Sequence, residues 1–140
     1  MTITEMKPED LRYVLRNPMD LDAGALGEVE INHKAYSAWD NNRCVGVGGV
    51  NWIHPYCGEA WVLFSEDVKQ CRLGIYRATR KLLTKILAEH PYRRVQATVR
   101  VDVPQAIKMI ERLGFKYESI LHNYAIDGTP HYMYVKLKDI

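Results

Sequence analysis

A dense run of basic side chains makes the middle of this sequence a candidate site for an anion. The run lies between positions 69 and 94, where the only acidic residue is Glu89, and it comprises Lys69, Arg72, Arg77, Arg80, Lys81, Lys85, Arg93 and Arg94. Such a run could contact nucleic acid or a phosphorylated cofactor. It could equally be a solvated helix face. The choice depends on which element carries the run.

Several other side chains could transfer protons or bind a cation. Glu59 opens the apolar stretch EAWVLFSE, where a carboxylate would suit a general base, although it could also be an exposed strand-end glutamate. Glu28 and Glu30 could bind a cationic amine or simply lie on the surface, and His54 could relay a proton through water. Cys71 lies near basic groups that could lower its pKa, but no surrounding motif marks it as a nucleophile.

Composition and cysteine usage restrict the class of protein. His54 and Cys57 are metal-ligand types, but no second close pair completes a ligand set, so we expect no metal. The 140 residues, 47% hydrophobic and 26% charged, predict one globular domain over 1–140. Three cysteines without a tight framework predict free thiols and a cytoplasmic location. We expect no membrane span, since no apolar run approaches roughly 20 residues, and MTITEMKPEDL is too polar for a secretory signal.

Strands and helices that could position these groups follow one another along the chain. In the first half, periodicity predicts strands over 3–6, 33–40, 44–53 and 59–66 and helices over 8–16 and, more weakly, 21–31. Asn41, Asn42 and Arg43 predict a hairpin turn between the second and third strands.

The second half continues the alternation. It predicts an amphipathic helix over 73–89, strands over 95–102, 118–126 and 131–137, and a turn at Asp127 and Gly128. A short helix falls between the first two of these strands, with Asp102 as a potential cap, Pro104 at an early position and Gly114 as its left-handed stop. The order predicts an α/β (α+β) domain with a mixed sheet of about six to seven strands and helices on both faces.

This order, together with EAWVLFSEDVKQCRLGIYRATRKLL and RVQATVRVDVPQAIKMIERLGF, resembles the GCN5-related N-acetyltransferases, the GNAT family. That family places a central strand before a phosphate-binding turn and a long helix. A further strand and a short helix that commonly ends LGF then follow. Within the family, the chain looks most like the short acetyltransferase-like proteins of tailed bacteriophages.

The resemblance implies a cofactor, acetyl-CoA as acyl donor, and positions for it. The pantetheine would pair with backbone groups of Val62, Leu63 and Phe64, in an opening between the parallel strands over 59–66 and 95–102. The pyrophosphate would bind the start of the long helix, at Arg72, Leu73, Gly74, Ile75, Tyr76 and Arg77. Glu59 lies about where one branch of the family carries a glutamate base.

The chain departs from the family at positions that matter for catalysis. In the phosphate-binding turn, Cys71 replaces the usual glutamine or arginine, and Tyr76 replaces a small residue. Ile110 stands where many members carry a tyrosine that protonates the leaving thiolate, and Val103 replaces a common asparagine. Tyr124 could substitute as general acid, or it could serve in packing.

Three functions compete on this basis. The first is an acetyl-CoA-dependent N-acetyltransferase acting on a primary amine of a small molecule, a protein or a modified nucleobase. The second is a non-catalytic GNAT-fold phage protein that serves in the virion or in host interaction, with or without CoA binding. The third is a nucleic-acid-binding protein. We expect acetyl-CoA and an amine as binding partners. We expect the protein to act in the cytoplasm, which for a phage protein is the cytoplasm of the host. A homodimer could form if HYMYVKL offers an exposed edge.

Overall fold

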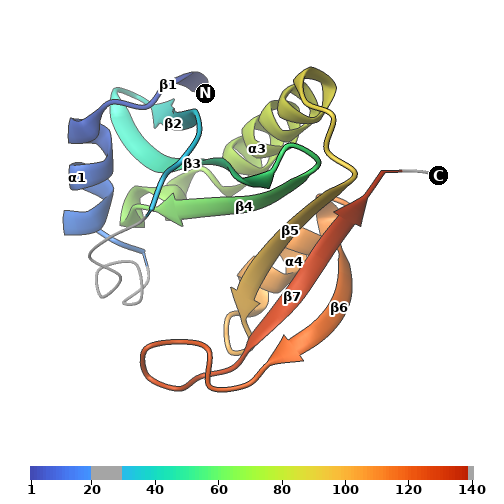
Figure 1. Ribbon diagram of the computed structural model, residues 1–140. Helices are drawn as coiled ribbons and strands as arrows, with labels where there is room; N and C mark the ends of the chain where they lie inside the picture. The colour runs from blue at the N-terminus through green and yellow to red at the C-terminus, as the bar shows by residue number, and fades with distance from the viewer. Residues whose placement is uncertain (20–29, 139–140) are drawn as a thin grey trace.

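The computed structural model describes residues 1–19 and 30–138 (Figure 1). Its elements are β1 (Thr2–Glu5), α1 (Pro8–Arg16), β2 (Ala35–Asp40), β3 (Arg43–His54), β4 (Cys57–Phe64), the 3-10 helix η1 (Glu66–Gln70), α3 (Arg72–Glu89), β5 (Arg94–Arg100), α4 (Pro104–Arg112), β6 (Lys116–Leu121) and β7 (His131–Leu137). Glu28 and nearly all of the helix expected over 21–31 lie outside the described residues.

The strands form one mixed sheet, as expected. Its seven strands have the order β1-β2-β3-β4-β5-β7-β6, and every neighbouring pair is antiparallel except β4 and β5. The prediction that the strand over 131–137 offers an exposed edge is wrong, because β7 lies between β5 and β6. The final hairpin instead folds back so that the later strand pairs with β5, leaving β6 at the edge.

Helices cover both faces of the sheet, which confirms the predicted fold class (Figure 1). One face packs against α3 and α4 in a core that includes Leu83, Ile86, Val95, Ile110 and Leu113. The opposite face packs against α1 through Val14, Cys44 and Val47. None of the helices in the described part of the chain is long and apolar enough to cross a membrane.

The short helix α4 ends as predicted but begins differently. Gly114 has φ +91°, and the amide of Phe115 donates to the carbonyl of Ile110, so the glycine stop is confirmed. Asp102 does not cap the helix, since the N-cap is Val103 and has no side-chain capping bond. The carboxylate of Asp102 instead accepts hydrogen bonds from Arg100.

The two predicted hairpin turns had different outcomes. Asn41 and Asn42 both adopt positive φ, 50° and 64°, and form the expected tight turn between β2 and β3. The strand predicted over 118–126 is wrong beyond Leu121, where β6 ends. Residues 122–130 form a longer loop, in which Asn123 and Gly128 have positive φ. Tyr124 therefore lies on a loop and not on a strand.

Candidate functional site

The two parallel strands at the centre of the sheet pair over only part of their length. Cys57 is the register partner of Arg94, Gly58 of Val95 and Glu59 of Gln96. Beyond Glu59, β4 continues to Phe64 and β5 to Arg100, and no described strand pairs with β4 on this side. Figure 1 shows β4 and β5 separating towards their arrowheads. The opening expected between these strands therefore begins immediately after Glu59.

The register decides which backbone groups of β4 face this opening. The amide of Ser65 donates to the carbonyl of Val45 on β3 at 3.0 Å. Along an antiparallel strand, the backbone groups of successive residues point alternately towards and away from the neighbouring strand. Leu63, two residues before Ser65, therefore also directs its amide and carbonyl towards β3. The backbone groups of Val62 and Phe64 therefore face away from β3. The carbonyl of Phe64 already accepts a hydrogen bond from the amide of Met19 at 3.0 Å. Of the three predicted positions, Val62 has neither its amide nor its carbonyl bonded to any of the described residues.

The start of α3 presents backbone amides that have no hydrogen-bond acceptor in the described part of the chain. The first amide of α3 to make an intrahelical hydrogen bond is that of Ile75, which donates to the carbonyl of Cys71 at 2.9 Å. The amides of Arg72, Leu73 and Gly74 therefore point out of the helix start, where the helix dipole favours an anion. Leu73 is 60% exposed, whereas Ile75 is buried and packs beside Ala38 and Val45. The helix start can thus hold a phosphate through backbone groups.

Tyr76 is turned away from this helix start. Its hydroxyl donates to the Arg112 carbonyl at 3.2 Å, and its ring packs against the core formed by α3, α4 and β5. The bulky side chain therefore ties α3 to the end of α4. Arg72 and Arg77 are exposed and can reach solvent or an anion near the helix start.

Glu59 lies at the apex of the opening and is half-buried. Its register partners are Asn51 on β3 and Gln96 on β5, so three polar side chains form a row on one face of the sheet. Asn51 donates through Nδ2 to the carbonyl of Glu30 at 2.7 Å and accepts from the amide of Asn32. These bonds fix the segment that begins at Glu30 beside Glu59.

Tyr124 lies on the β6–β7 loop, beside the start of β7. It is 51% exposed, and its ring centroid lies 4.9 Å from that of His131, the register partner of Arg100. The stretch of β5 from Gln96 to Arg100 spans about 13 Å at 3.3 Å per residue. Tyr124 is therefore held near the carboxyl end of β5, while Glu59 lies at the apex.

The departures from the family pattern fall at positions with structural roles. Ile110 is buried in the main core, and Val103 is the N-cap of α4. Neither can donate a side-chain proton. His54 is the last residue of β3, at the end of β4 opposite the opening. Its Nδ1 accepts a hydrogen bond from the amide of Tyr56 in the β3–β4 turn.

The expected lowering of the Cys71 pKa is wrong. Burial, followed by the negative charges of Asp40 and Asp67, raises the pKa of this thiol. Its Sγ lies 3.7 Å from the carbonyl of Val68. The described residues contain no group of three histidine, cysteine or acidic side chains that could hold a metal ion.

Sequence reasoning missed three residues that the structure brings to this region. Asn51 and Gln96 flank Glu59, and Arg100 joins two carboxylates at the end of β5. Alternation along 95–102 identifies Gln96 and Arg100 as residues opposite the buried face. The sequence contains no sign of their pairing partners, because these depend on strand register.

Comparisons of the structure find N-acetyltransferases. Ard1 from Thermoplasma volcanium superposes with a TM-score of 0.75 at 20% identity, over 99% of this chain and 98% of that one. A variant of the spermidine N-acetyltransferase SpeG from Vibrio cholerae gives 0.74 at 16% identity, over 98% and 95%. The ribosomal-protein-S18-alanine N-acetyltransferase from Escherichia coli gives 0.73 at 18% identity, over 99% and 94%.

These superpositions define the class of fold. The chain has the GNAT α/β fold along nearly its whole length, in agreement with the resemblance seen in the sequence. No protein-family model matches the sequence, and neither does any curated protein.

Proposed function

We propose that this protein is an acetyl-CoA-dependent N-acetyltransferase that acts on a primary amine. The observation that carries the proposal is the end of the β4–β5 pairing at Glu59 and Gln96. It leaves the backbone groups of Val62 without a partner among residues 1–19 and 30–138, on the side of β4 that leads to the start of α3. An extended amide-containing chain with an anionic end fits this combination.

The residues present fit acetyl-CoA in two respects. The edge of β4 at Val62 offers one donor and one acceptor to the pantetheine amides. The amides of Arg72, Leu73 and Gly74 would hold the pyrophosphate, with the side chains of Arg72 and Arg77 adding positive charge. Tyr76 leaves this surface open because its hydroxyl is bonded to α4.

Bound acetyl-CoA would supply an activated acetyl thioester. The carboxylate of Glu59 would take the proton that an acceptor ammonium must lose before its nitrogen becomes nucleophilic. Asn51 and Gln96 flank this carboxylate and limit the directions from which an amine reaches it. The phenol of Tyr124, towards the other end of the opening, would contact the acceptor.

The proposal extends to the class of acceptor amine. The neighbours' names include ribosomal-protein alanine and spermidine. We therefore propose these amines, as an alanine-starting peptide and as free spermidine, for a first panel. The three free cysteines favour action in the cytoplasm, of a bacterial host if the resemblance to phage proteins reflects the source.

Thermal unfolding with acetyl-CoA tests the cofactor site directly. At 100 times Kd the ligand adds about 2.7 kcal/mol to the free energy of unfolding. We expect a clear rise in Tm with acetyl-CoA and a smaller one with ATP at equal ionic strength. An equal rise with ATP would indicate only a phosphate-binding surface, and no rise with saturating acetyl-CoA would overturn the proposal.

Acetylation of the amine panel tests the reaction. We expect release of free CoA that depends on an amine and is lost in Glu59→Gln. Acetyl-CoA binding without transfer to any amine would favour a non-catalytic role for the fold.

A further inference from the structure

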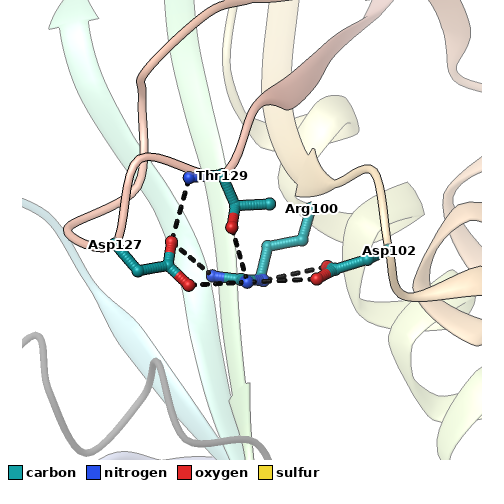
Figure 2. A network of polar contacts seen from close by, with 4 residues as sticks. All are labelled: Arg100, Asp102, Asp127 and Thr129. Atoms are coloured by element: carbon teal, nitrogen blue, oxygen red, sulfur yellow. Dashed lines mark hydrogen bonds and ion pairs between the residues drawn. The ribbon is translucent and has the colours of Figure 1, made fainter.

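One arginine joins three segments at the carboxyl end of β5. Arg100 donates through Nε and Nη2 to the two carboxylate oxygens of Asp102 at 3.0 and 3.1 Å. It also donates through Nη2 to Asp127 at 3.1 Å and to the Thr129 hydroxyl at 3.0 Å. Figure 2 shows the guanidinium between the two carboxylates. The Arg100 side chain is only 14% exposed, so these charge-assisted bonds are partly shielded from water.

The contacts of Arg100 continue into the β6–β7 loop. The amide of Thr129 donates to Asp127, and the amide of Ala125 donates to the Thr129 carbonyl at 3.1 Å. The Pro130 carbonyl accepts from the amide of Val101, which follows Arg100. The loop is therefore tied to the end of β5 at Asp127, Thr129 and Pro130. Ala125 is bonded back to Thr129 within the loop, and Tyr124 immediately precedes it.

The network lies on the same face of the sheet as Glu59. Gln96 is the register partner of Glu59, and Arg100 follows it at an even spacing on β5, so both side chains leave the strand on one face. Because β4 and β5 are parallel, the end of β5 that carries Arg100 is also the end at which the strands have separated. The tied loop thus borders the opening that begins at Glu59.

We propose that Arg100 is a positioning residue, which holds the 122–130 loop, and Tyr124 with it, beside the opening so that the loop contacts the acceptor. The catalytic consequence rests on the proposed acetyltransferase function. About 13 Å of strand separates Gln96 from Arg100, so the loop contacts the part of the acceptor remote from the amine at Glu59. Such contacts are made in the bound ground state as well as in the transition state, and their loss raises KM more than it lowers kcat.

The chemistry of the site requires arginine. One planar guanidinium carries enough N–H groups to bond two carboxylates at once, whereas a lysine ammonium is a point charge without this fork. Arg100→Lys should therefore retain charge but hold the loop less well, and Arg100→Gln should release it. Glu118→Gln is the matched control, since it removes the bidentate pair with Arg94 at the opposite end of β5.

The experiment combines hydrogen exchange with steady-state kinetics on the full chain. In Arg100→Gln we expect the amides of Ala125 and Gly128 to exchange at least about tenfold faster. With the best amine of the alanine-peptide and spermidine panel, KM should rise about tenfold, and the Tm increase with acetyl-CoA should be unchanged. Arg100→Lys should lie between, and Glu118→Gln should match the unaltered chain.

A double-mutant cycle separates positioning from general destabilisation. Tyr124→Phe should lower kcat/KM in the unaltered chain but add little in Arg100→Gln, because the released loop no longer places the phenol. Additive effects would overturn the coupling. If Arg100→Gln does not fold, Arg100→Lys and Asp127→Asn provide the same comparison.

Other outcomes also decide the proposal. Unchanged exchange in the loop, or faster exchange with unchanged KM, would overturn it. If the unaltered chain neither binds acetyl-CoA nor acetylates any amine of the panel, the proposed function and the catalytic role of Arg100 both fail. The exchange data would still decide whether Arg100 holds the loop.

Discussion

Glu59 and Gln96 form the last register pair between β4 and β5, and the two strands separate immediately beyond them. This relationship places a carboxylate at the point where β4 begins an edge with which no described strand pairs. A ligand that pairs with this edge would end beside Glu59. The same opening leads at its other end to the start of α3 and to the loop held by Arg100.

Replacing the carboxylate tests its role as base. Glu59→Gln should lower kcat/KM by about 10²- to 10⁴-fold, because an amide cannot accept the ammonium proton. Steady-state kinetics with the panel amines gives the loss, and the acetyl-CoA-dependent rise in Tm should persist. Glu89→Gln, at the exposed end of α3, is the charge-matched control. Full activity in Glu59→Gln would assign proton removal to another group or to water.

Proline substitution at neighbouring positions tests the backbone assignment in β4. Val62→Pro removes an amide that faces the opening, so it should cost no ladder bond with β3. Loss of one hydrogen bond to the pantetheine should weaken acetyl-CoA binding about tenfold. Leu63→Pro should remove a bond to β3 and lower Tm substantially. Titration calorimetry gives the Kd for acetyl-CoA, and thermal unfolding gives the Tm of each variant. Equal losses of Tm in the two variants would show that the assignment of Val62 to the opening and Leu63 to β3 is wrong.

Charge at the helix start should matter for the cofactor and not for the fold. Arg72→Ala should weaken acetyl-CoA binding about tenfold and reduce its dependence on salt, since a charge-assisted contact to phosphate is lost. Lys85→Ala, more than three turns along α3, should bind as the unaltered chain does. Similar affinities for both variants would indicate that the backbone amides alone hold the anion.

Tyr76 should prove to be a structural residue. Tyr76→Phe removes the hydroxyl that donates to the Arg112 carbonyl, and the free energy of unfolding should fall by no more than about 1.5 kcal/mol. The Kd for acetyl-CoA should change by less than about twofold. A tenfold weaker Kd would mean that the hydroxyl turns to the phosphates when the cofactor binds.

Stability at alkaline pH should depend on Cys44. Burial raises the pKa of this thiol from 9.0 to about 11. The native state therefore keeps a proton that the unfolded chain releases, and stability falls as pH rises from 9.0 towards about 11. Denaturant unfolding across this range should show a shallower decline in Cys44→Ala. Parallel declines in the two proteins would show that Cys44 contributes nothing to the pH dependence.

Local sequence patterns were sufficient for much of the framework. The stretch PEDLRYVLR predicts α1 with the bounds that the structure has, because Pro8 marks its start and apolar residues recur at helical spacing. Gly114 likewise marks the end of α4 through its positive φ. These features depend on residues within a few positions of one another. The order of elements they define, together with the sequence resemblance over 59–115, indicated the GNAT fold.

The candidate site depends on pairings between distant parts of the chain. Nothing local to Glu59 indicates that β5 leaves β4 at that residue, that Val62 faces the opening or that Leu63 faces β3. Tyr124 was expected on a strand, but hydrogen bonds within its loop and to Arg100 hold it outside β6. The sequence by itself determined most of the described helices and strands and their order, because propensity, periodicity and capping are local. The tertiary structure alone decided which amides remain free and which side chains share a face, because strand register is set by contacts across the whole sheet.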